Sequence, residues 1–123
     1  MKARRILHAS VNVSGRLAEA GAFYRDLLGL EVAERPEIPG VGGTWFAVGD
    51  GQVHLVDAPS RGAGIDPTGH HFCLGVDDIS EALAELEARG IEHVTARQGE
   101  VLQVWVTDPA GNTIELQQLP AGP

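Results

Sequence analysis

An internal repeat constrains the fold of this chain most strongly, because the order strand, helix, strand, strand, strand occurs twice. In the first half, the strand-like RILHASVNV precedes the helical RLAEAGAFYRDLL and three short apolar runs, LEVAE, GTWFAVG and QVHLVD. In the second half, HFCLGV precedes a helix with capping-box spacing between Asp78 and Glu81, and then IEHVTA, VLQVWVT and NTIELQQ. Both helices stop at a glycine, Gly29 or Gly90, where a left-handed residue commonly ends a helix. A duplicated β-α-β-β-β module explains this order.

The boundaries of the two modules follow from composition. Module one is expected at about residues 5–57, a linker at about 58–67 and module two at about 68–119, because APSRGAGIDPTG is rich in glycine and proline. The alternative is one continuous α+β sheet whose halves are alike by chance. Polar residues that match inside apolar strands, such as His8 with His71, favour duplication.

Side-chain alternation along the strands identifies candidate site residues. In ILHASVNV the alternate residues from Leu7 are apolar and those from His8 are polar. In HFCLGV the alternate residues from Phe72 are apolar, and those from His71 are polar or small. Neighbouring strand residues point to opposite faces, so His71, and not His70, is the residue that matches His8.

The last strand of each module repeats this pattern, with His54 and Glu115 each flanked by apolar residues. Because the apolar faces pack on the helices, we expect His8, His54, His71 and Glu115 to lie on the uncovered faces. If the first and fourth strands are neighbours, each module contributes two ligands. One such histidine would more often be a polar strand residue. Four at matched positions predict a divalent metal site, for Zn, Ni, Fe, Co or Mn.

Further residues are expected near this site by the same alternation. Trp45, Gln103 and Trp105 are candidates for substrate binding, and an aromatic wall would suit an apolar or planar ligand. The alternative for the two tryptophans is packing in the core. His70 is expected at the strand entry and His93 at an edge or surface, both without a role in metal binding. Cys73 is expected to be a small buried thiol.

Bulk properties exclude several classes. A chain of 123 residues suits one domain, and its lone cysteine excludes an intrachain disulfide and a multi-cysteine zinc site. The formal net charge of −8 argues against nucleic acid and anionic membranes as partners. No apolar run of about 18 residues or signal peptide is present, so we expect a soluble cytoplasmic protein.

The repeat, the segment FYRDLLGL and above all VTDPAGNTIEL resemble the vicinal oxygen chelate superfamily over residues 5–119. That group includes glyoxalase I, methylmalonyl-CoA epimerase, extradiol dioxygenases, fosfomycin-resistance transferases and bleomycin-resistance proteins. The resemblance implies an α+β fold, in which two tandem β-α-β-β-β modules form a U-shaped mixed sheet around a metal. It also implies a homodimer.

The resemblance assigns roles to residues. His8 matches the first-strand metal ligand, His71 the fifth-strand ligand, and Glu115 the last-strand glutamate that binds metal and acts as base. His54 departs from the pattern, because glyoxalase I typically has glutamate there and the epimerase has glutamine. The departure argues against either of those two activities but leaves a metal site intact.

Three functions are compatible with these residues. The favoured one is a metal-dependent lyase or isomerase of glyoxalase type, in which the metal chelates vicinal oxygens of a small oxygenated metabolite and Glu115 moves the proton. The arginines that would anchor glutathione form no cluster in the sequence; they are Arg16, Arg25, Arg35 and Arg97. An Fe(II) extradiol-type dioxygenase ranks lower, because His54 would occupy a position that O2 or substrate needs. The third is a resistance protein that sequesters a cationic antibiotic.

Overall fold

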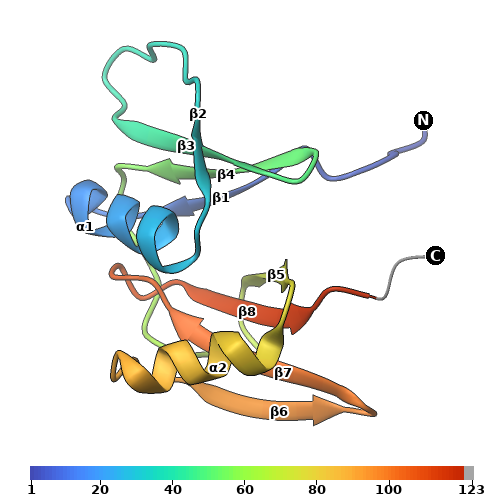
Figure 1. Cartoon of the computed structure of the whole chain (residues 1–123). Helices are drawn as coiled ribbons and strands as arrows, with labels where there is room; N and C mark the ends of the chain where they lie inside the picture. The colour runs from blue at the N-terminus through green and yellow to red at the C-terminus, as the bar shows by residue number, and fades with distance from the viewer. Residues whose placement is uncertain (121–123) are drawn as a thin grey trace. The chain divides into compact units, whose positions relative to one another are not determined.

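The computed structural model describes residues 1–120, which form two compact units. The first contains Met1–Arg61 and Asp108–Ala110, and the second contains Gly62–Thr107 and the chain from Gly111 onward. Each unit holds one four-stranded mixed sheet with helix beside it (Figure 1). The fold is therefore α+β with two tandem modules, as the sequence predicted. Within residues 1–120, no helix is both long and apolar enough to cross a membrane.

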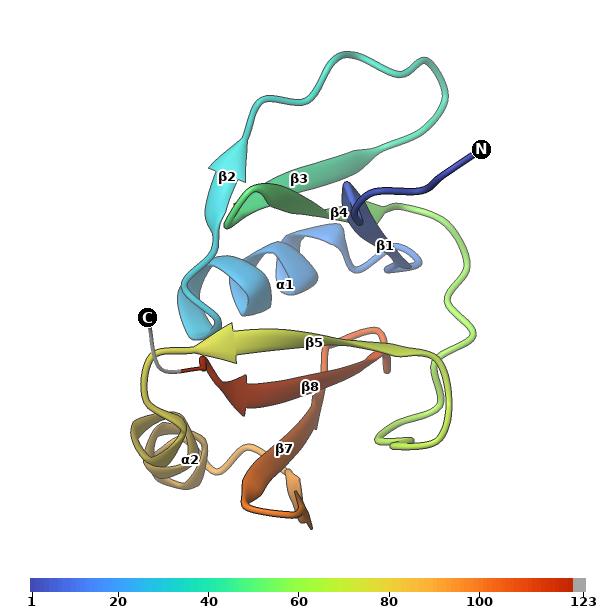
Figure 2. The same ribbon diagram turned by 90° about the vertical axis from the view of Figure 1, so that its right-hand side faces the viewer.

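The first unit has the strand order β1-β4-β3-β2, in which β1 is parallel to β4 and the other pairs are antiparallel. Figure 2 shows its helix lying along one face of this sheet. Its elements are β1 (His8–Asn12), α1 (Leu17–Ala22), the π-helical turn η1 (Phe23–Leu27), β2 (Glu31–Ala33), β3 (Gly43–Val48) and β4 (Gly51–Val56).

The predicted helix RLAEAGAFYRDLL is not uniform. It changes from α-helix to a π turn at Phe23, and the N–H of Leu28 donates to the carbonyl of Phe23 at 3.1 Å, five residues earlier. Gly29 then has φ +68°, as expected of the glycine that follows a helix. The start and the end of the helix were readable from the sequence, whereas the change of hydrogen-bond pattern inside it was not.

The second unit has the equivalent order β5-β8-β7-β6. Asp78 caps its helix, accepting hydrogen bonds from the N–H groups of Ser80 and Glu81 at 2.9 and 3.1 Å, and Gly90 has φ +66°. Its elements are β5 (His71–Val76), α2 (Ile79–Ala88), β6 (Val94–Gln98), β7 (Val101–Thr107) and β8 (Thr113–Gln118).

Strand β6 begins three residues later than IEHVTA predicted. The N–H of Ile91 donates to the carbonyl of Leu86 at 2.9 Å and thereby completes the end of α2. The ring Nδ1 of His93 donates to the carbonyl of Ile91 at 2.8 Å. Ile91 and His93 therefore belong to the end of the helix, and strand β6 begins after them.

Strand pairing confirms the internal repeat. In β1 and β4, Ser10 lies opposite His54, and in β5 and β8, Cys73 lies opposite Glu115. The first and fourth strands of each module are thus neighbours. The third strands also match, because Trp45 pairs with His54 and Trp105 pairs with Glu115. The alternative of one continuous sheet is wrong, since the strands hydrogen-bond in two separate sheets.

Burial corrects one expectation. Alternation is confirmed along β1 and β5, where every second residue is exposed. However, His54 and Glu115 are only 9% and 4% exposed, so these two side chains are buried although they share a face with exposed residues. Both residues lie on inner strands, and side chains from the two neighbouring strands cover them. Alternation predicts the face of a residue, but not whether its neighbours cover it.

A buried polar contact lies in the first unit. Tyr24, which is fully buried, donates its hydroxyl hydrogen to Oδ2 of Asp108 at 2.7 Å, and Asp108 is only 3% exposed. The other carboxylate oxygen, Oδ1, accepts from the N–H of Ala110 at 2.9 Å within the turn DPAG. Burial, followed by the charge of Asp108, raises the pKa of the Tyr24 hydroxyl. The turn is therefore tied to the helical segment by a charge-assisted hydrogen bond.

Candidate functional site

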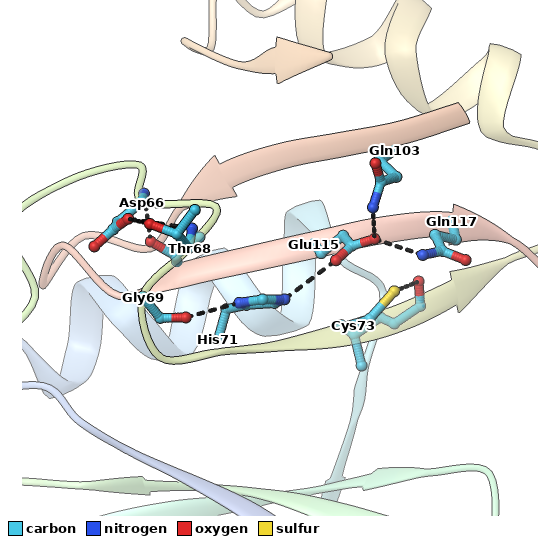
Figure 3. A network of polar contacts seen from close by, with 10 residues as sticks. Asp66, Thr68, Gly69, His71, Cys73, Gln103, Glu115 and Gln117 are labelled. Atoms are coloured by element: carbon cyan, nitrogen blue, oxygen red, sulfur yellow. Dashed lines mark hydrogen bonds and ion pairs between the residues drawn. The ribbon is translucent and has the colours of Figure 1, made fainter. Parts of the chain in front are cut away.

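His71 and Glu115 meet on the neighbouring strands β5 and β8 (Figure 3). Nε2 of His71 lies 3.2 Å from Oε1 of Glu115, while Nδ1 donates to the carbonyl of Gly69 at 3.0 Å. With its proton on Nδ1, a neutral ring directs the lone pair of Nε2 towards a carboxylate oxygen. A positive charge, either a proton on Nε2 or a metal ion between the two atoms, stabilises a contact at this distance.

The spacing of this pair is compatible with two ligands of one divalent metal. Nitrogen and oxygen ligands lie about 2.0–2.2 Å from zinc, so two neighbouring ligand atoms are roughly 3–3.5 Å apart. The 3.2 Å between His71 and Glu115 lies in this range. The carbonyl of Gly69 orients the ring as carbonyls commonly orient metal-binding histidines.

Two glutamine side chains position the carboxylate of Glu115. Its Oε2 accepts hydrogen bonds from Nε2 of Gln103 at 3.3 Å and from Nε2 of Gln117 at 2.5 Å (Figure 3). Gln103 was predicted to lie near the site. Gln117 was missed, although its place two residues after Glu115 on one strand signals a shared face. Because both amides donate to Oε2, the opposite oxygen is the one presented to His71.

Trp105 covers the same pair. Its ring meets that of His71 edge to face, with the ring centroids 4.7 Å apart, and the residue is 4% exposed. Its indole Nε1 is buried without a hydrogen-bond partner among residues 1–120. Trp105 is buried and also borders the candidate site, and its role in substrate binding stays a prediction.

Cys73 differs from the expected buried thiol. The residue as a whole is exposed, and only its sulfur is partly covered. Burial, followed by the negative charge of Glu115, raises the pKa of the thiol to about 11. A high pKa makes this sulfur a weak nucleophile at neutral pH.

Alkylation of Cys73 is therefore expected to be slow in metal-free protein. A shift of about two pKa units lowers the thiolate fraction at pH 8 roughly 100-fold relative to an ordinary thiol. The rate with iodoacetamide should rise about tenfold per pH unit up to pH ~10. The variant Glu115→Gln should react faster at pH 8, because it removes the nearby negative charge. An equal rate in both proteins would contradict the electrostatic contact.

The two ligands predicted in the first unit form a stack instead. The rings of His8 and His54 are 4.1 Å apart and inclined by 15°, and the ring of Trp45 stacks on His54 at 3.9 Å and 3°. Nε2 of His54 donates to Oε1 of Gln52 at 2.7 Å. Stacked rings do not point their nitrogens at a common ion. Burial, the charge of His8 and that of Arg35 lower the pKa of His54, which favours its neutral form.

The four predicted ligands thus occur as two pairs. His71 and Glu115 have a spacing compatible with a metal, whereas His8 and His54 are stacked. Among residues 1–120, no group of three or more His, Cys, Asp or Glu side chains is arranged to hold a metal ion. His70 is exposed, and Nε2 of His93 lies 4.0 Å from Oε1 of Glu87.

Comparison with known proteins places this geometry in a family. Residues 5–116 match the Glyoxalase/Bleomycin resistance protein/Dioxygenase superfamily. The chain belongs to this superfamily. Its members typically use a divalent metal, bind small-molecule substrates and often form dimers. The matched residues include His8, His54, His71 and Glu115, so the four predicted ligands lie within the superfamily domain.

Individual relatives of this superfamily member include enzymes. The mitochondrial methylmalonyl-CoA epimerase of Mus musculus is 31% identical, over 95% of this chain and 74% of that protein. Among solved structures, a glyoxalase family protein from Bacillus anthracis has a TM-score of 0.84 and 29% identity, over 98% of both chains. The lactoylglutathione lyase of Agrobacterium tumefaciens has a TM-score of 0.74 and 28% identity, over 96% of both chains.

Proposed function

We propose that this protein is a divalent-metal-dependent isomerase or lyase of glyoxalase type, which moves a proton next to a carbonyl group of a small oxygenated metabolite. The observation that carries the proposal is the buried carboxylate of Glu115, held 3.2 Å from Nε2 of His71. The relatives named as an epimerase and a lyase support an enzyme over a passive domain.

Glu115 is proposed as the proton carrier. The amides of Gln103 and Gln117 fix Oε2, so Oε1 has both remaining roles: it would be the metal ligand at rest, and it would take up and return the proton after it has left the metal. Burial of the carboxylate keeps bulk water away from the proton in transfer. The fixed position of the Glu115 carboxylate and its exclusion from bulk water together make it suitable for acid-base catalysis.

His71 and Glu115 are proposed to hold the metal. His8 and His54, the other two ligands that the sequence predicts, would have to leave their stack with Trp45 to bind the same ion, either within one chain or across a homodimer. When bound, a divalent metal polarises a substrate oxygen and thereby lowers the cost of removing the adjacent proton. The ligand types suit Zn, Ni, Fe, Co or Mn and do not distinguish among them.

The proposal is tested by metal analysis and proton exchange. Protein purified without added ions is expected to contain a divalent metal and to catalyse exchange of a substrate C–H proton with D2O, followed by NMR. The probes are methylmalonyl-CoA and the adduct of methylglyoxal with glutathione. Chelation should abolish the exchange, and re-addition of the metal should restore it. A metal-free protein that exchanges neither probe would contradict the proposal.

The adjacent histidines His70 and His71 provide a matched pair of variants. His71→Ala is expected to weaken metal affinity by at least about 100-fold, since it removes a direct ligand, whereas His70→Ala should leave affinity unchanged. A competitive titration against a chromophoric chelator measures both. If His70→Ala lost the metal and His71→Ala retained it, the ligand assignment would be wrong.

A second candidate, a drug-binding protein, is favoured by one observation. The stack of Trp45, His54 and His8 is an aromatic arrangement that suits a planar ring better than it suits an ion. A metal-free protein that binds bleomycin, and loses this binding in Trp45→Ala, would support sequestration over catalysis.

A further inference from the structure

The turn that precedes β5 is held together by one aspartate side chain. The sequence Asp66-Pro67-Thr68-Gly69 has aspartate, proline and glycine at the positions that a β-turn favours. The N–H of Gly69 donates to the carbonyl of Asp66 at 3.1 Å and thereby closes the turn. The N–H and the hydroxyl of Thr68 also donate to Oδ1 of Asp66, at 3.2 and 3.1 Å (Figure 3). The turn is therefore stabilised from within, and its last residue lies two positions before His71.

The carboxylate of Asp66 packs directly on the backbone of Gly69. A Cβ at position 69 would lie 2.3 Å from Oδ2 and 2.8 Å from Cγ of Asp66, so this position requires glycine. Since Oδ1 accepts two hydrogen bonds from Thr68, the carboxylate cannot move aside without losing them. The carbonyl of this same glycine accepts the hydrogen bond from Nδ1 of His71 at 3.0 Å. Asp66 therefore determines where that carbonyl lies.

Thr113 attaches the same turn to the strand that carries Glu115. Thr113 is 5% exposed, and it lies two residues before Glu115 on β8, opposite His71 on β5. Its hydroxyl accepts a hydrogen bond from the N–H of Asp66 at 3.0 Å and donates one to the carbonyl of Gly64 at 3.0 Å. One hydroxyl thus binds the backbone at the start of the turn through both its donor and an acceptor. The C-terminal end of the predicted linker is consequently attached to the sheet.

These contacts form a continuous path from β8 to the ring of His71. A carbonyl oxygen accepts hydrogen bonds but cannot donate them, so the contact with Gly69 requires a proton on Nδ1 of the ring. The other ring nitrogen, Nε2, is then directed at Oε1 of Glu115. Outer hydrogen bonds of this kind fix both the tautomer and the orientation of metal-binding histidines.

We propose that Asp66 and Thr113 are positioning residues for His71. They hold the carbonyl of Gly69 where it keeps the proton on Nδ1 and leaves Nε2 available to a metal. The inference rests on the proposed function, in which His71 is a ligand. It extends that function because it assigns a role to two side chains that contact neither Glu115 nor the ring of His71 themselves. The alternative is that their hydrogen bonds only stabilise the fold.

The ring proton of His71 in metal-free protein is the first measurement that tests this inference. Correlated ¹H–¹⁵N NMR detects the proton on Nδ1, and its absence in His71→Ala identifies the signal. In wild-type protein we expect this proton to exchange slowly with water. In Asp66→Ala and in Thr113→Val it should exchange at least about tenfold faster, because the carbonyl of Gly69 is no longer held beside the ring. The second measurement is zinc affinity, by competition with a chromophoric chelator, which should fall about 10- to 100-fold in both variants.

Conservative variants and a remote aspartate serve as controls. Asp66→Asn keeps Oδ1 as an acceptor and Thr113→Ser keeps the hydroxyl, so both should retain slow exchange and zinc affinity within about threefold of wild type. Asp50, in the turn between β3 and β4, has a side chain that is 89% exposed, and Asp50→Ala should change neither measurement. Because Asp66→Ala and Thr113→Val remove different hydrogen bonds, either one is sufficient for the test if the other folds poorly.

Three results would contradict the inference. The first is unchanged exchange of the ring proton in both Asp66→Ala and Thr113→Val. The second is faster exchange with unchanged zinc affinity. The third is a lower melting temperature with slow exchange retained, which would indicate a purely structural role. If wild-type protein binds no zinc, the proposed function fails, but exchange of the ring proton still shows whether Asp66 and Thr113 position His71, so the two failures are distinguishable.

Discussion

Glu115→Gln is expected to lower turnover by about 100- to 10,000-fold, because general acid-base catalysis by one side chain commonly contributes 10²–10⁴. Glutamine has nearly the same shape as glutamate but cannot take up the proton at Oε1. The hydrogen bond that Gln117 donates to Oε2 can be retained by an amide oxygen, so the fold should be preserved. Proton exchange of the substrate with D2O measures the loss directly, and metal content is determined in the same sample.

The matched control for this variant is Glu87→Gln. Glu87 is a carboxylate on α2 with 64% of its side chain exposed, and its replacement should leave turnover unchanged. Loss of turnover with metal partly retained assigns a proton-transfer role to Glu115. Full activity in Glu115→Gln would exclude that role, and a much lower melting temperature would instead indicate a structural one.

Much of the architecture followed from two properties of the sequence. Alternation of polar and apolar residues assigned each strand a face, and the repeat implied that the first and fourth strands of each module are neighbours. Together they were sufficient to bring His71 to Glu115, a contact made by residues 44 apart. These patterns can be read from the sequence because backbone geometry, which all residues of a strand share, decides the face on which each side chain lies.

Other features depend on side-chain packing, which the pattern does not encode. The stacking of His8 on His54 is a choice of rotamer, and the burial of His54 depends on the size of the residues on both neighbouring strands. Glycine is required at position 43, because a Cβ there would lie 2.4 Å from the backbone oxygen of Leu55 on the next strand. Each of these features joins residues whose contact appears only when the sheet is assembled.

The largest expected effect on stability comes from Tyr24→Phe. The substitution leaves Oδ2 of Asp108 buried without the hydroxyl that donates to it at 2.7 Å. Hydrogen bonds to charged groups contribute about 1.5–3 kcal/mol, so the free energy of unfolding should fall by about this amount. Urea denaturation of metal-free protein measures the change. In a double-mutant cycle with Asp108→Asn, the two losses should be less than additive, because both variants remove the same contact.

Asp26→Asn is the control for this cycle. Asp26 pairs with Arg25 at 2.9 Å on the surface, where the side chains are 59% and 53% exposed, and surface pairs contribute at most about 1 kcal/mol. If Asp26→Asn lowered the free energy of unfolding as much as Asp108→Asn does, the destabilisation would not come from burial of the contact. Strictly additive losses in Tyr24→Phe and Asp108→Asn would show that their hydrogen bond contributes little.

Alkaline pH provides an independent test of the same contact. The pKa of Tyr24 in the folded protein is raised above its ordinary value of 10.0, so the folded state holds this proton more tightly than the unfolded state does. The stabilising contribution of the hydroxyl is complete below pH ~10 and is lost as the pH rises above that value. Tyr24 is the only tyrosine in the chain, so tyrosinate absorbance reports on this residue alone. Wild-type protein should therefore lose stability above pH ~10 and develop this absorbance only as it unfolds, whereas the stability of Tyr24→Phe should lack that component. Tyrosinate that forms near pH 10 in folded protein would contradict the buried contact with Asp108.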